Sequence, residues 1–391
     1  MSDSLMRLRV EKLIWRGRGL ARPADAPVVI VEPGVLPGEE IQARITKRHK
    51  DYLRAKCETV LEPASERRPH PCPASPACGG CRFGITSQRT QLALKQAIMA
   101  DTLRRHLGKE VPASVLESPQ VVPSPKGWRY RWRGQLHVHQ GQPHLLGQGS
   151  HAKVPIERCL LFARPLAEAL PRLARDLPDG RHTVAASPVD HAVASALETH
   201  RLSLPLPGGL AVDVLPQTFF QANQSLNPAL VEHIRSWCPA GSRVADLYAG
   251  AGNFGLPLAQ AGNPVFAVEG DGPALQAART TAARSGLDHW QGRQADLRHE
   301  RAWKHILEFQ PDVVVADPPR SGSGPVCRHL LHIPSLERII WISCDLTNSA
   351  RDVRSFLTQG WQLTSLALFD MFPQTWHMEG VFILDRRGSN G

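Results

Sequence analysis

The feature of this sequence that most constrains its fold is a regular alternation of short apolar runs and helix-capable segments after Asn223. The apolar runs read RVADLYAG, NPVFAVEG, DVVVADPP and RIIWISC, and segments such as GPALQAARTTAARSG lie between them. Runs of this kind predict buried strands, and the intervening segments predict helices. Such β-α-β-α alternation is typical of a doubly wound, Rossmann-like sheet. We therefore expect an α/β domain over residues 223–391.

Two smaller parts are expected ahead of this domain. Residues 1–62 contain short β-branched runs interrupted by Gly and Pro-Gly, a pattern that predicts a small β-barrel. Residues 63–222 begin with a Pro-rich connector and predict a central, mostly antiparallel β domain. One helix is predicted over about residues 86–107, and we expect it to pack on the α/β domain. Its apolar face is expected to contain Leu92, Leu94, Ile98, Leu103 and Leu107.

The composition excludes disordered and membrane-spanning classes of protein. The 391 residues are 42% hydrophobic and 21% charged, which is the balance of a soluble globular chain. No run of 18 apolar residues is present, so no membrane span is expected. The first residues, MSDSLMRLRVEK, lack the apolar run of a secretory signal. These observations predict a cytoplasmic protein.

The net charge of +10 favours a polyanionic partner. Between Arg82 and Arg133 the sequence has ten Lys or Arg residues and only three Asp or Glu residues. The segment KGWRYRWRG alternates arginines with aromatic residues, and alternation places the two types on opposite faces of a strand. One face would then meet phosphates while the other stacks on bases. An ordinary aromatic core under a solvated basic face explains the segment equally well.

The segment VADLYAGAGNFGLPLAQAG has the order strand, Gly-rich turn and helix that binds nucleotides. Gly250 and Gly252 would let the backbone approach a ligand closely. Glu269 ends the next strand, where a carboxylate can accept hydrogen bonds from ribose hydroxyls. Gly250, Gly252 and Gly255 also fit the dinucleotide-binding spacing G-x-G-x-x-G. The glycines alone therefore leave a dinucleotide enzyme open.

Two later features favour S-adenosylmethionine. Asp296 follows the third strand-like run, a common place for an acid that contacts adenine. In ADPPRSG, Pro318 and Pro319 stiffen the chain just after a strand, so that Asp317 and Arg320 are held at the rim of the site. A strand that merely ends at proline would explain the prolines but not the flanking Asp and Arg.

The eight cysteines are not expected to form a disulfide framework in a chain of this length without a signal peptide. Cys72, Cys78 and Cys81 lie close together in the connector, within CPASPACGGC, and Cys159 follows much later. Four thiolates suit Zn²⁺ and an iron–sulfur cluster equally well. Cys344 stands where an apolar strand ends. It is either a small buried hydrophobe or a nucleophile at a ligand-binding edge.

Seven motifs, spread in order over almost the whole chain, resemble the RNA (uracil-5-)-methyltransferase family. They are CPASPACGGC with Cys159, QTFFQAN, DLYAGAGNFGLPLA, VEG, ADPPR, SCD and MFPQTWHMEG. The resemblance is greater to the branch with an N-terminal TRAM domain, an OB-like RNA-binding barrel, and an iron–sulfur cluster. It implies a class I methyltransferase domain over residues 223–391 and a [4Fe-4S] cluster on Cys72, Cys78, Cys81 and Cys159. Cys57, Cys238 and Cys327 match no ligand and are interpreted as structural.

The resemblance also implies roles for residues of the α/β domain. S-adenosyl-L-methionine would be bound by Gln221, Tyr248, Asn253, Glu269, Asp296 and Asp317. Cys344 matches the nucleophile and Glu379 the proton acceptor, and His377 beside it could help to orient that carboxylate. Thiolate addition at uracil C6 makes C5 nucleophilic enough to take a methyl group, after which a base removes the C5 proton.

One departure from the family pattern lies next to the nucleophile. Asp345-Leu346 stands where the family commonly has Asn-Pro. A carboxylate pointing inward would disfavour the Cys344 thiolate. If Asp345 instead caps the following helix, its side chain turns away from the thiol.

The expected partner is RNA. Family members that act on tRNA typically lack both the barrel and the cluster, so 23S ribosomal RNA is favoured and tRNA comes second. Arg16, Arg18, Lys47, Arg48, Lys50 and Arg54 of the barrel are expected to contact phosphates. The alternatives are a non-catalytic RNA-binding or assembly factor and a base-amino methyltransferase that uses Asp-Pro-Pro. No membrane partner is expected, and the protein is expected to be a monomer.

Overall fold

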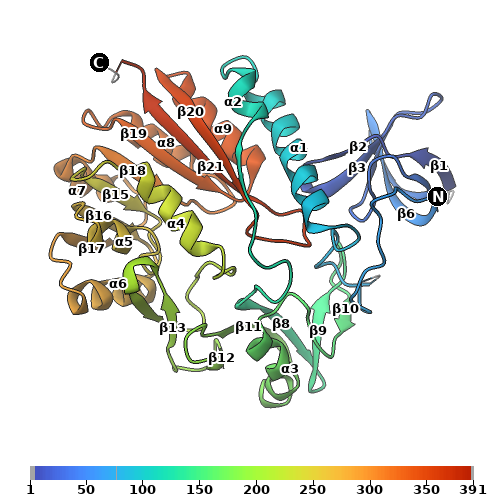
Figure 1. Cartoon of the computed structure of the whole chain (residues 1–391), viewed down its shortest axis with the longest axis horizontal. Helices are drawn as coiled ribbons and strands as arrows, with labels where there is room; N and C mark the ends of the chain where they lie inside the picture. The colour runs from blue at the N-terminus through green and yellow to red at the C-terminus, as the bar shows by residue number, and fades with distance from the viewer. Residues whose placement is uncertain (1–4, 76, 389–391) are drawn as a thin grey trace.

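The computed structural model describes residues 5–75 and 77–388, which form three parts. An N-terminal sheet lies at one side, the large C-terminal domain at the other, and a central β domain below and between them (Figure 1). None of the described helices combines the length and apolar character needed to span a membrane.

The N-terminal part is a single sheet of six strands in the order β1-β5-β6-β4-β3-β2. All pairs are antiparallel except β4 with β6. A short 3-10 turn, η1 (Trp15–Gly17), joins β2 to β3. Alternate residues of β4 and β5 are buried, as expected of strands that cover a core on one face. The strands are β1 (Leu5–Arg9), β2 (Lys12–Ile14), β3 (Arg18–Ala21), β4 (Val28–Val31), β5 (Glu40–Arg48) and β6 (Tyr52–Glu62).

The central domain is built on an antiparallel sheet in the order β10-β9-β8-β11-β12, in agreement with the mostly antiparallel β structure predicted for it. Helix α3 (Arg164–Asp176) buries Leu166, Leu170 and Leu173 in the core beneath this sheet. A separate hairpin, β13 (Leu202–Pro205) with β14 (Ala211–Val214), encloses the turn η2 (Pro207–Gly209). The sheet strands are β8 (Arg133–His139), β9 (Gln142–Leu146), β10 (Lys153–Pro155), β11 (Gly180–Ala186) and β12 (Val193–Ser195).

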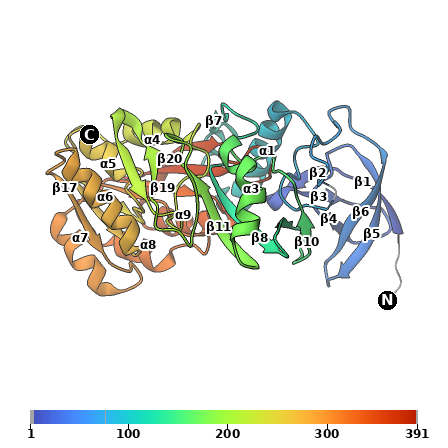
Figure 2. The ribbon, with the colours of Figure 1, turned by 90° about the horizontal axis from the view of Figure 1, so that it is seen from below.

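Helix α1 (Gln88–Leu107) lies between the N-terminal sheet and the C-terminal domain (Figures 1 and 2). Ser87 caps it by accepting a hydrogen bond from the Thr90 amide. The predicted helix is confirmed, but its buried face is partly different from the prediction. Leu92 and Leu94 are only half-buried, whereas Gln91 and Lys95 are fully buried. After α1 the chain forms α2 (Ala113–Glu117) and β7 (Gln120–Val122).

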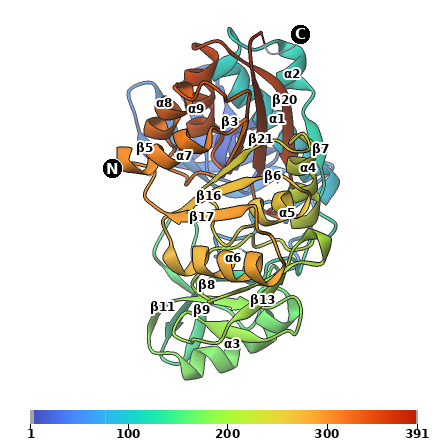
Figure 3. The same cartoon turned by 90° about the vertical axis from the view of Figure 1, so that its left-hand side faces the viewer.

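The C-terminal domain has an eight-stranded sheet in the order β17-β16-β15-β18-β19-β21-β20-β7, with helices on both faces (Figure 3). Strands β15 to β19 are parallel, and β21 is antiparallel to both β19 and β20. Strands β15 and β18 are buried throughout, as both faces of such a sheet are covered. The strands are β15 (Val244–Leu247), β16 (Val265–Glu269), β17 (Trp290–Gln294), β18 (Val313–Ala316), β19 (Arg338–Ser343), β20 (Trp361–Phe369) and β21 (Glu379–Arg386). The helices are α4 (Asn227–Ser236), α5 (Gly255–Gln260), α6 (Gly272–Arg284), η3 (Glu300–Ala302), α7 (Trp303–Phe309), α8 (Gly324–Leu331) and α9 (Leu346–Leu357).

The direction of the strands places a set of loops at one edge of this sheet. The carboxyl ends of β15, β16, β17, β18 and β19 all meet there, because these strands are parallel. Strand β21 runs the other way, so its first residues lie at the same edge. The register pairs Ser343, at the end of β19, with Gly380 near the start of β21. Open α/β sheets bind their ligands at this kind of edge.

Candidate active site

The predicted site residues lie at the carboxyl edge of the parallel strands. Tyr248 follows β15, Glu269 ends β16, Asp296 follows β17, Asp317 follows β18 and Cys344 follows β19. A sixth residue, the acid Glu379, is the first residue of the antiparallel β21 and so reaches the same edge. The fold therefore gathers side chains that are far apart in the sequence.

Glu269 is tied directly to the Gly-rich turn. Its two carboxylate oxygens accept hydrogen bonds from the amides of Gly250, at 2.8 Å, and of Asp271, at 2.7 Å. Gly252 has a φ of +86°, and a side chain there would meet Leu256 at 2.7 Å. The turn therefore requires glycine at position 252. Its backbone lies open beside a half-buried carboxylate.

Four of the six predicted cofactor residues line one cavity of about 50 Å³ beside this turn: Gln221, Tyr248, Asn253 and Asp317. Gln221 donates a hydrogen bond to the Asp317 carboxylate at 3.2 Å. The Tyr248 hydroxyl lies 2.8 Å from that of Ser323. The rest of the lining is mainly apolar, from the β13–β14 hairpin and the QTFF segment. The cavity thus combines an apolar wall with a few polar groups, as small-molecule sites do.

The other two predicted cofactor residues lie outside this cavity. Glu269 is connected to it through the Gly250 amide. Asp296 is more distant, and both of its carboxylate oxygens are engaged by Arg298, at 2.7 to 3.1 Å. The same guanidinium holds the pKa of Asp296 well below its usual value. The Asp296 carboxylate is therefore ionised, and it lies partly exposed outside this cavity.

Cys344 lies at the edge of a second cavity, of about 490 Å³, which Arg16, Arg320, Asp345, Trp376 and His377 also line. The thiol is partly buried, and burial is the main reason why its pKa is raised to about 12. The nearby charge of Glu379 raises the pKa further. Arg320 opposes both effects, because the positive charge of its guanidinium favours the thiolate and lowers the pKa.

Two carboxyl groups, the half-buried Asp317 and the buried Glu379, lie close enough to this thiol for their charges to raise its pKa. Burial raises the pKa of Asp317 to about 7. Burial also raises the pKa of Glu379 well above its usual value, and the charge of Asp317 adds to the effect. Two carboxyl groups that interact in this way titrate as a pair. Asp317 and Glu379 are therefore the two carboxyl groups beside Cys344 that could serve as a general base.

The four cysteines predicted to bind a cluster line a single cavity of about 640 Å³. Burial and the charges of the other three sulfurs raise the pKa of Cys81, which shows that the four lie close together. His70 connects the two ends of the segment from Cys72 to Cys81. Its ring accepts a hydrogen bond from the Cys72 amide and contacts the Cys81 carbonyl, each at 3.0 Å. In the described ranges, no group of three or more Cys, His, Asp or Glu side chains already forms a site that could hold a metal ion. The four cysteines therefore line the same cavity, but their thiols are not arranged as the ligands of a metal ion.

Residues 211–387 match the protein family described as tRNA (uracil-5-)-methyltransferase. The 23S rRNA (uracil(1939)-C(5))-methyltransferase RlmD of Shewanella amazonensis is 31% identical over 97% of this chain and 95% of that protein. The same enzyme of Halomonas elongata is 32% identical over 99% of this chain and 91% of that protein. The chain belongs to the RNA (uracil-5-)-methyltransferase family. This confirms the resemblance seen in the sequence motifs.

A solved structure supports the same fold for the whole chain. The tRNA (uracil-54, C5)-methyltransferase of Pyrococcus abyssi, in complex with S-adenosyl-L-homocysteine, superposes with a TM-score of 0.75. The match covers 97% of this chain and 99% of that one, at 22% identity. The Rossmann-like domain of this family member, with its mixed sheet, is therefore the fold that the strand and helix alternation predicted.

The departure from the family pattern after Cys344 is explained by helix capping. The Asp345 carboxylate accepts a hydrogen bond from the Asn348 amide at 3.1 Å, which makes it the N-cap of α9. Its side chain is therefore turned toward the helix, as the capping interpretation predicted. Asp345 is not among the charges that raise the pKa of Cys344. The substitution leaves the thiol beside Arg320.

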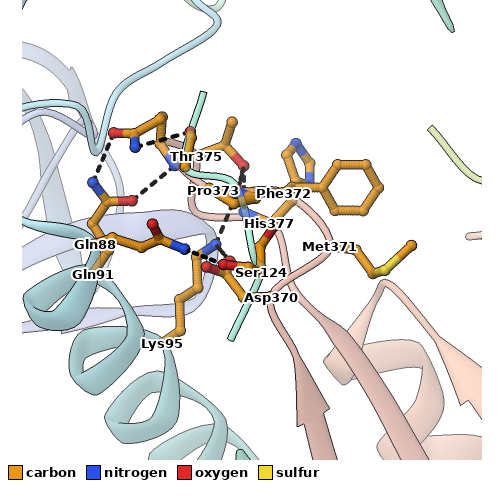
Figure 4. Close-up of polar contacts among 12 residues, drawn as sticks. Gln88, Gln91, Lys95, Ser124, Asp370, Met371, Phe372, Pro373, Thr375 and His377 are labelled. Carbon is orange, nitrogen blue, oxygen red and sulfur yellow. Dashed lines mark hydrogen bonds and ion pairs between the residues drawn. The ribbon is translucent and has the colours of Figure 1, made fainter. Parts of the chain in front are cut away.

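Sequence reasoning missed the polar network that holds the loop between β20 and β21. This loop, residues 370–378, carries Trp376 and His377 into the Cys344 cavity. Lys95 and Gln91 of α1 bind the loop from beneath (Figure 4). They are four residues apart, and this helical spacing places them on the same buried face as Ile98 and Met99. The predicted apolar face of this helix did not include them, and their spacing from Ile98 and Met99 is the one signal in the sequence that could have indicated their burial.

His377 was expected to help orient Glu379, and the structure places it differently. Its ring packs against that of Trp376, with 3.7 Å between the ring centres, and no hydrogen bond joins it to Glu379 in the described structure. Burial and the nearby Arg320 and Lys95 lower its pKa to about 3. The ring is therefore neutral and forms part of the wall of the cavity.

Proposed function

We propose that this protein methylates C5 of a uridine in RNA through a covalent adduct with Cys344. The observation that supports this most is the meeting of a thiol, a guanidinium and two carboxyl groups, one buried and one half-buried, at one edge of the sheet. A thiol alone would be a small buried hydrophobe. A thiol beside both a cation that favours its thiolate and a pair of bases is suited to nucleophilic catalysis.

The mechanism starts with addition of the Cys344 thiolate to uracil C6, and the electron pair of the C5–C6 double bond moves toward C5 and O4. S-adenosylmethionine, when bound, would supply the methyl group from its sulfonium: the methyl–sulfur bond would break, its electron pair would stay on sulfur, and S-adenosylhomocysteine would leave. C5 forms the new carbon–carbon bond and then carries both a methyl group and a hydrogen. The Glu379 carboxylate removes that hydrogen as a proton. The C5–C6 double bond re-forms as the C6–S bond breaks, and the thiolate of Cys344 is released.

The cofactor would lie along the rim from Glu269 to Asp317. Glu269 is placed at the end of β16, where a carboxylate binds ribose hydroxyls, and Asp296 follows the next strand. Gln221, Tyr248 and Asn253 line the small cavity, and that cavity would hold only a part of the ligand. Asp317 borders both this cavity and the thiol. Asp317 would therefore lie between the methyl donor and the uracil ring that receives the methyl group.

The proposed substrate is 23S ribosomal RNA, because both RlmD relatives match over almost the whole chain. Transfer RNA is the second candidate, since the Pyrococcus protein with the same overall fold is named for a tRNA uridine. The six-stranded N-terminal sheet would act as a TRAM-like RNA-binding barrel. Arg16, in the turn η1, is exposed and lines the Cys344 cavity. A guanidinium at this entrance could bind a phosphate next to the flipped uridine.

Cys72, Cys78, Cys81 and Cys159 would hold a [4Fe-4S] cluster. The donor set fits, because four soft thiolates in one cavity are the ligands that such clusters use. Cys78 and Cys81 flank Gly79 and Gly80, and a side chain at Gly79 would meet the backbone of Gln148 at 3.0 Å. The cluster would tie the connector to the central sheet. Uracil methylation requires no electron transfer, so the proposed role is structural.

The test uses purified protein, methyl-labelled S-adenosylmethionine, and unmodified 23S rRNA and tRNA transcripts in parallel. Nucleoside analysis should find 5-methyluridine in 23S rRNA, and Cys344→Ala should abolish it. Cys238→Ala removes a buried thiol far from the site and serves as the matched control. Product in tRNA alone would keep the chemistry and overturn the substrate. The absence of 5-methyluridine from both RNAs, with folded protein that binds them, would contradict the proposal.

A further inference from the structure

Helix α1 and the loop after β20 are joined by an ion pair that is entirely buried. The Lys95 ammonium lies 2.6 Å from the Asp370 carboxylate, and both side chains are 0% exposed. Lys95 also donates a hydrogen bond to the Phe372 carbonyl at 2.9 Å. Figure 4 shows the lysine reaching from α1 to the point where the loop begins. One charged group thus fixes two positions of the loop.

A second set of bonds fixes the middle of the same loop. Gln91 and Gln374 bind reciprocally: the Gln91 amide donates to the Gln374 side chain and accepts from the Gln374 backbone, each at 2.8 Å (Figure 4). Gln374 has a φ of +67°, a conformation that a non-glycine residue adopts only when its surroundings impose it. The Tyr130 hydroxyl donates to the Pro373 carbonyl at 3.0 Å. The loop is therefore held in one conformation from several sides.

This loop forms the wall of the proposed catalytic cavity. Trp376 and His377 line the space beside Cys344. Glu379 lies two residues after His377 and pairs with Phe369, the residue before Asp370, across the β20–β21 hairpin. The Lys95–Asp370 pair thus lies directly behind the segment that carries the proton acceptor. A shift of the loop would move the cavity wall and Glu379 relative to the thiol.

Stability alone does not account for this pair. A buried ion pair loses so much solvation that apolar residues of similar volume are often as stabilising or more so. One Asp370 oxygen is buried and has no hydrogen-bond partner in the described part of the chain, which adds to that cost. A pair of this kind can instead serve to specify one arrangement of the chain.

We propose that Lys95 and Asp370 are positioning residues for proton abstraction: they hold residues 370–378 so that the Glu379 carboxylate reaches the C5 proton of the methylated adduct. The inference rests on the proposed function. In the step concerned, the C5–H bond breaks, its proton passes to Glu379, its electron pair forms the C5–C6 double bond, and the C6–S bond returns its electrons to Cys344. Methyl transfer precedes this step and does not need the base.

The test compares these two steps in one turnover. The RNA carries tritium at uridine C5, and the S-adenosylmethionine carries a ¹⁴C methyl group. The variant is Lys95→Met/Asp370→Leu, which replaces the pair with apolar side chains and is expected to remain folded. We expect ¹⁴C incorporation close to that of the unmodified protein and tritium release slower by about 10- to 100-fold, since small misplacements have effects of this size. A covalent protein–RNA adduct should accumulate.

The matched control is Arg338→Met/Asp385→Leu. It removes an ion pair of 2.7 Å between β19 and β21 at the end of the strands opposite to Cys344, and the ratio of tritium release to methylation should not change. If the Lys95 double variant does not fold, Gln91→Leu replaces it. That variant keeps the ion pair, loosens the same loop, and must shift the ratio in the same direction.

An unchanged ratio, or an equal fall in both rates, would overturn the positioning role. The unmodified protein distinguishes this failure from a failure of the proposed function. If it incorporates methyl and releases tritium, the function stands, and only the role of Lys95 and Asp370 is in question. If it does neither with 23S rRNA or tRNA, the proposed function itself fails, and the positioning role falls with it.

Discussion

Cys344 and the four cysteines of the connector region are the same side chain in two different settings. Burial raises the pKa of both Cys344 and Cys81. At Cys344 the neighbouring charges are of both signs: Arg320 favours the thiolate, whereas Glu379 and Asp317 disfavour it. At Cys81 the largest neighbouring effects come from three other sulfurs. Thiols arranged in this way lose their protons when a metal cation binds to the sulfurs. The surroundings, rather than the cysteine itself, are therefore what distinguishes the proposed nucleophile from the proposed ligands.

The largest expected effect concerns the nucleophile. Cys344→Ser keeps the size of the side chain but replaces the thiol with a hydroxyl that does not ionise near neutral pH. We expect the methylation rate to fall by about 10⁴-fold or more, because removal of a nucleophile leaves only the contributions of binding. The measurement is methyl incorporation per turnover. A serine variant with more than about a tenth of the original rate would show that this thiol is not the nucleophile.

A smaller loss is expected when the cation beside Cys344 is removed. Arg320→Gln keeps a hydrogen-bond donor but not the charge that lowers the pKa of the thiol. The methylation rate should fall by about 10²-fold, as for other single electrostatic contacts. The pH at which iodoacetamide alkylates Cys344 should rise. Arg131→Gln, near Cys81, should leave that alkylation profile unchanged, and an equal shift in both variants would contradict the comparison.

For the four proposed ligand cysteines we expect the reverse: a large effect on iron content and stability, and a small effect on the methylation rate. Cys81→Ser removes one of the four proposed ligands, and we expect the iron content of protein purified without oxygen to fall from about four atoms per chain to less than half of that. The melting temperature should fall as well. The rate of the folded fraction should change by less than about tenfold, because the proposed cluster takes no part in the chemistry. Iron content equal to that of the unmodified protein would exclude Cys81 as a ligand.

The smallest expected effect is a change of melting temperature with pH that comes from Asp317, beside Cys344. The pKa of Asp317 is raised from 3.8 to about 7 by burial. A carboxyl group with a raised pKa favours the folded state at low pH, and this contribution is lost as the pH rises toward 7. The melting temperature of the unmodified protein should therefore fall relative to that of Asp317→Asn over this range. For the exposed Asp190, hydrogen bonds lower the pKa, so its contribution changes only below the ordinary value of 3.8, and Asp190→Asn should run parallel to the unmodified protein between about pH 4 and 7. Parallel curves for the protein and Asp317→Asn would contradict the raised pKa.

Much of this account follows from the sequence because it rests on local patterns. Alternating apolar runs predicted the doubly wound sheet, and the strand-like runs before Asp317 and Cys344 predicted that both residues lie at strand ends. Of the two orientations considered for the Asp345 side chain, the helix-capping one is the orientation that the structure shows. Each of these inferences uses residues that are close together in the chain.

What the sequence did not reveal depends on contacts between distant segments. Lys95 is 275 residues from Asp370, and a single lysine in a helix predicts a solvated face. The register of β19 with β21, which brings Glu379 to the thiol, is also set by long-range pairing. The pKa values of Asp317 and Glu379 follow from burial that only the complete fold creates.

The most direct test of the central claim uses RNA in which 5-fluorouridine replaces uridine. Fluorine at C5 cannot leave as a cation, so an adduct methylated at C5 remains attached to the protein. After digestion, mass spectrometry should find the modified nucleotide on the peptide that contains Cys344, in the presence of S-adenosylmethionine. The absence of an adduct from folded protein that binds RNA and S-adenosylmethionine, or an adduct on Cys78 or Cys81, would contradict the assignment of Cys344 as the nucleophile.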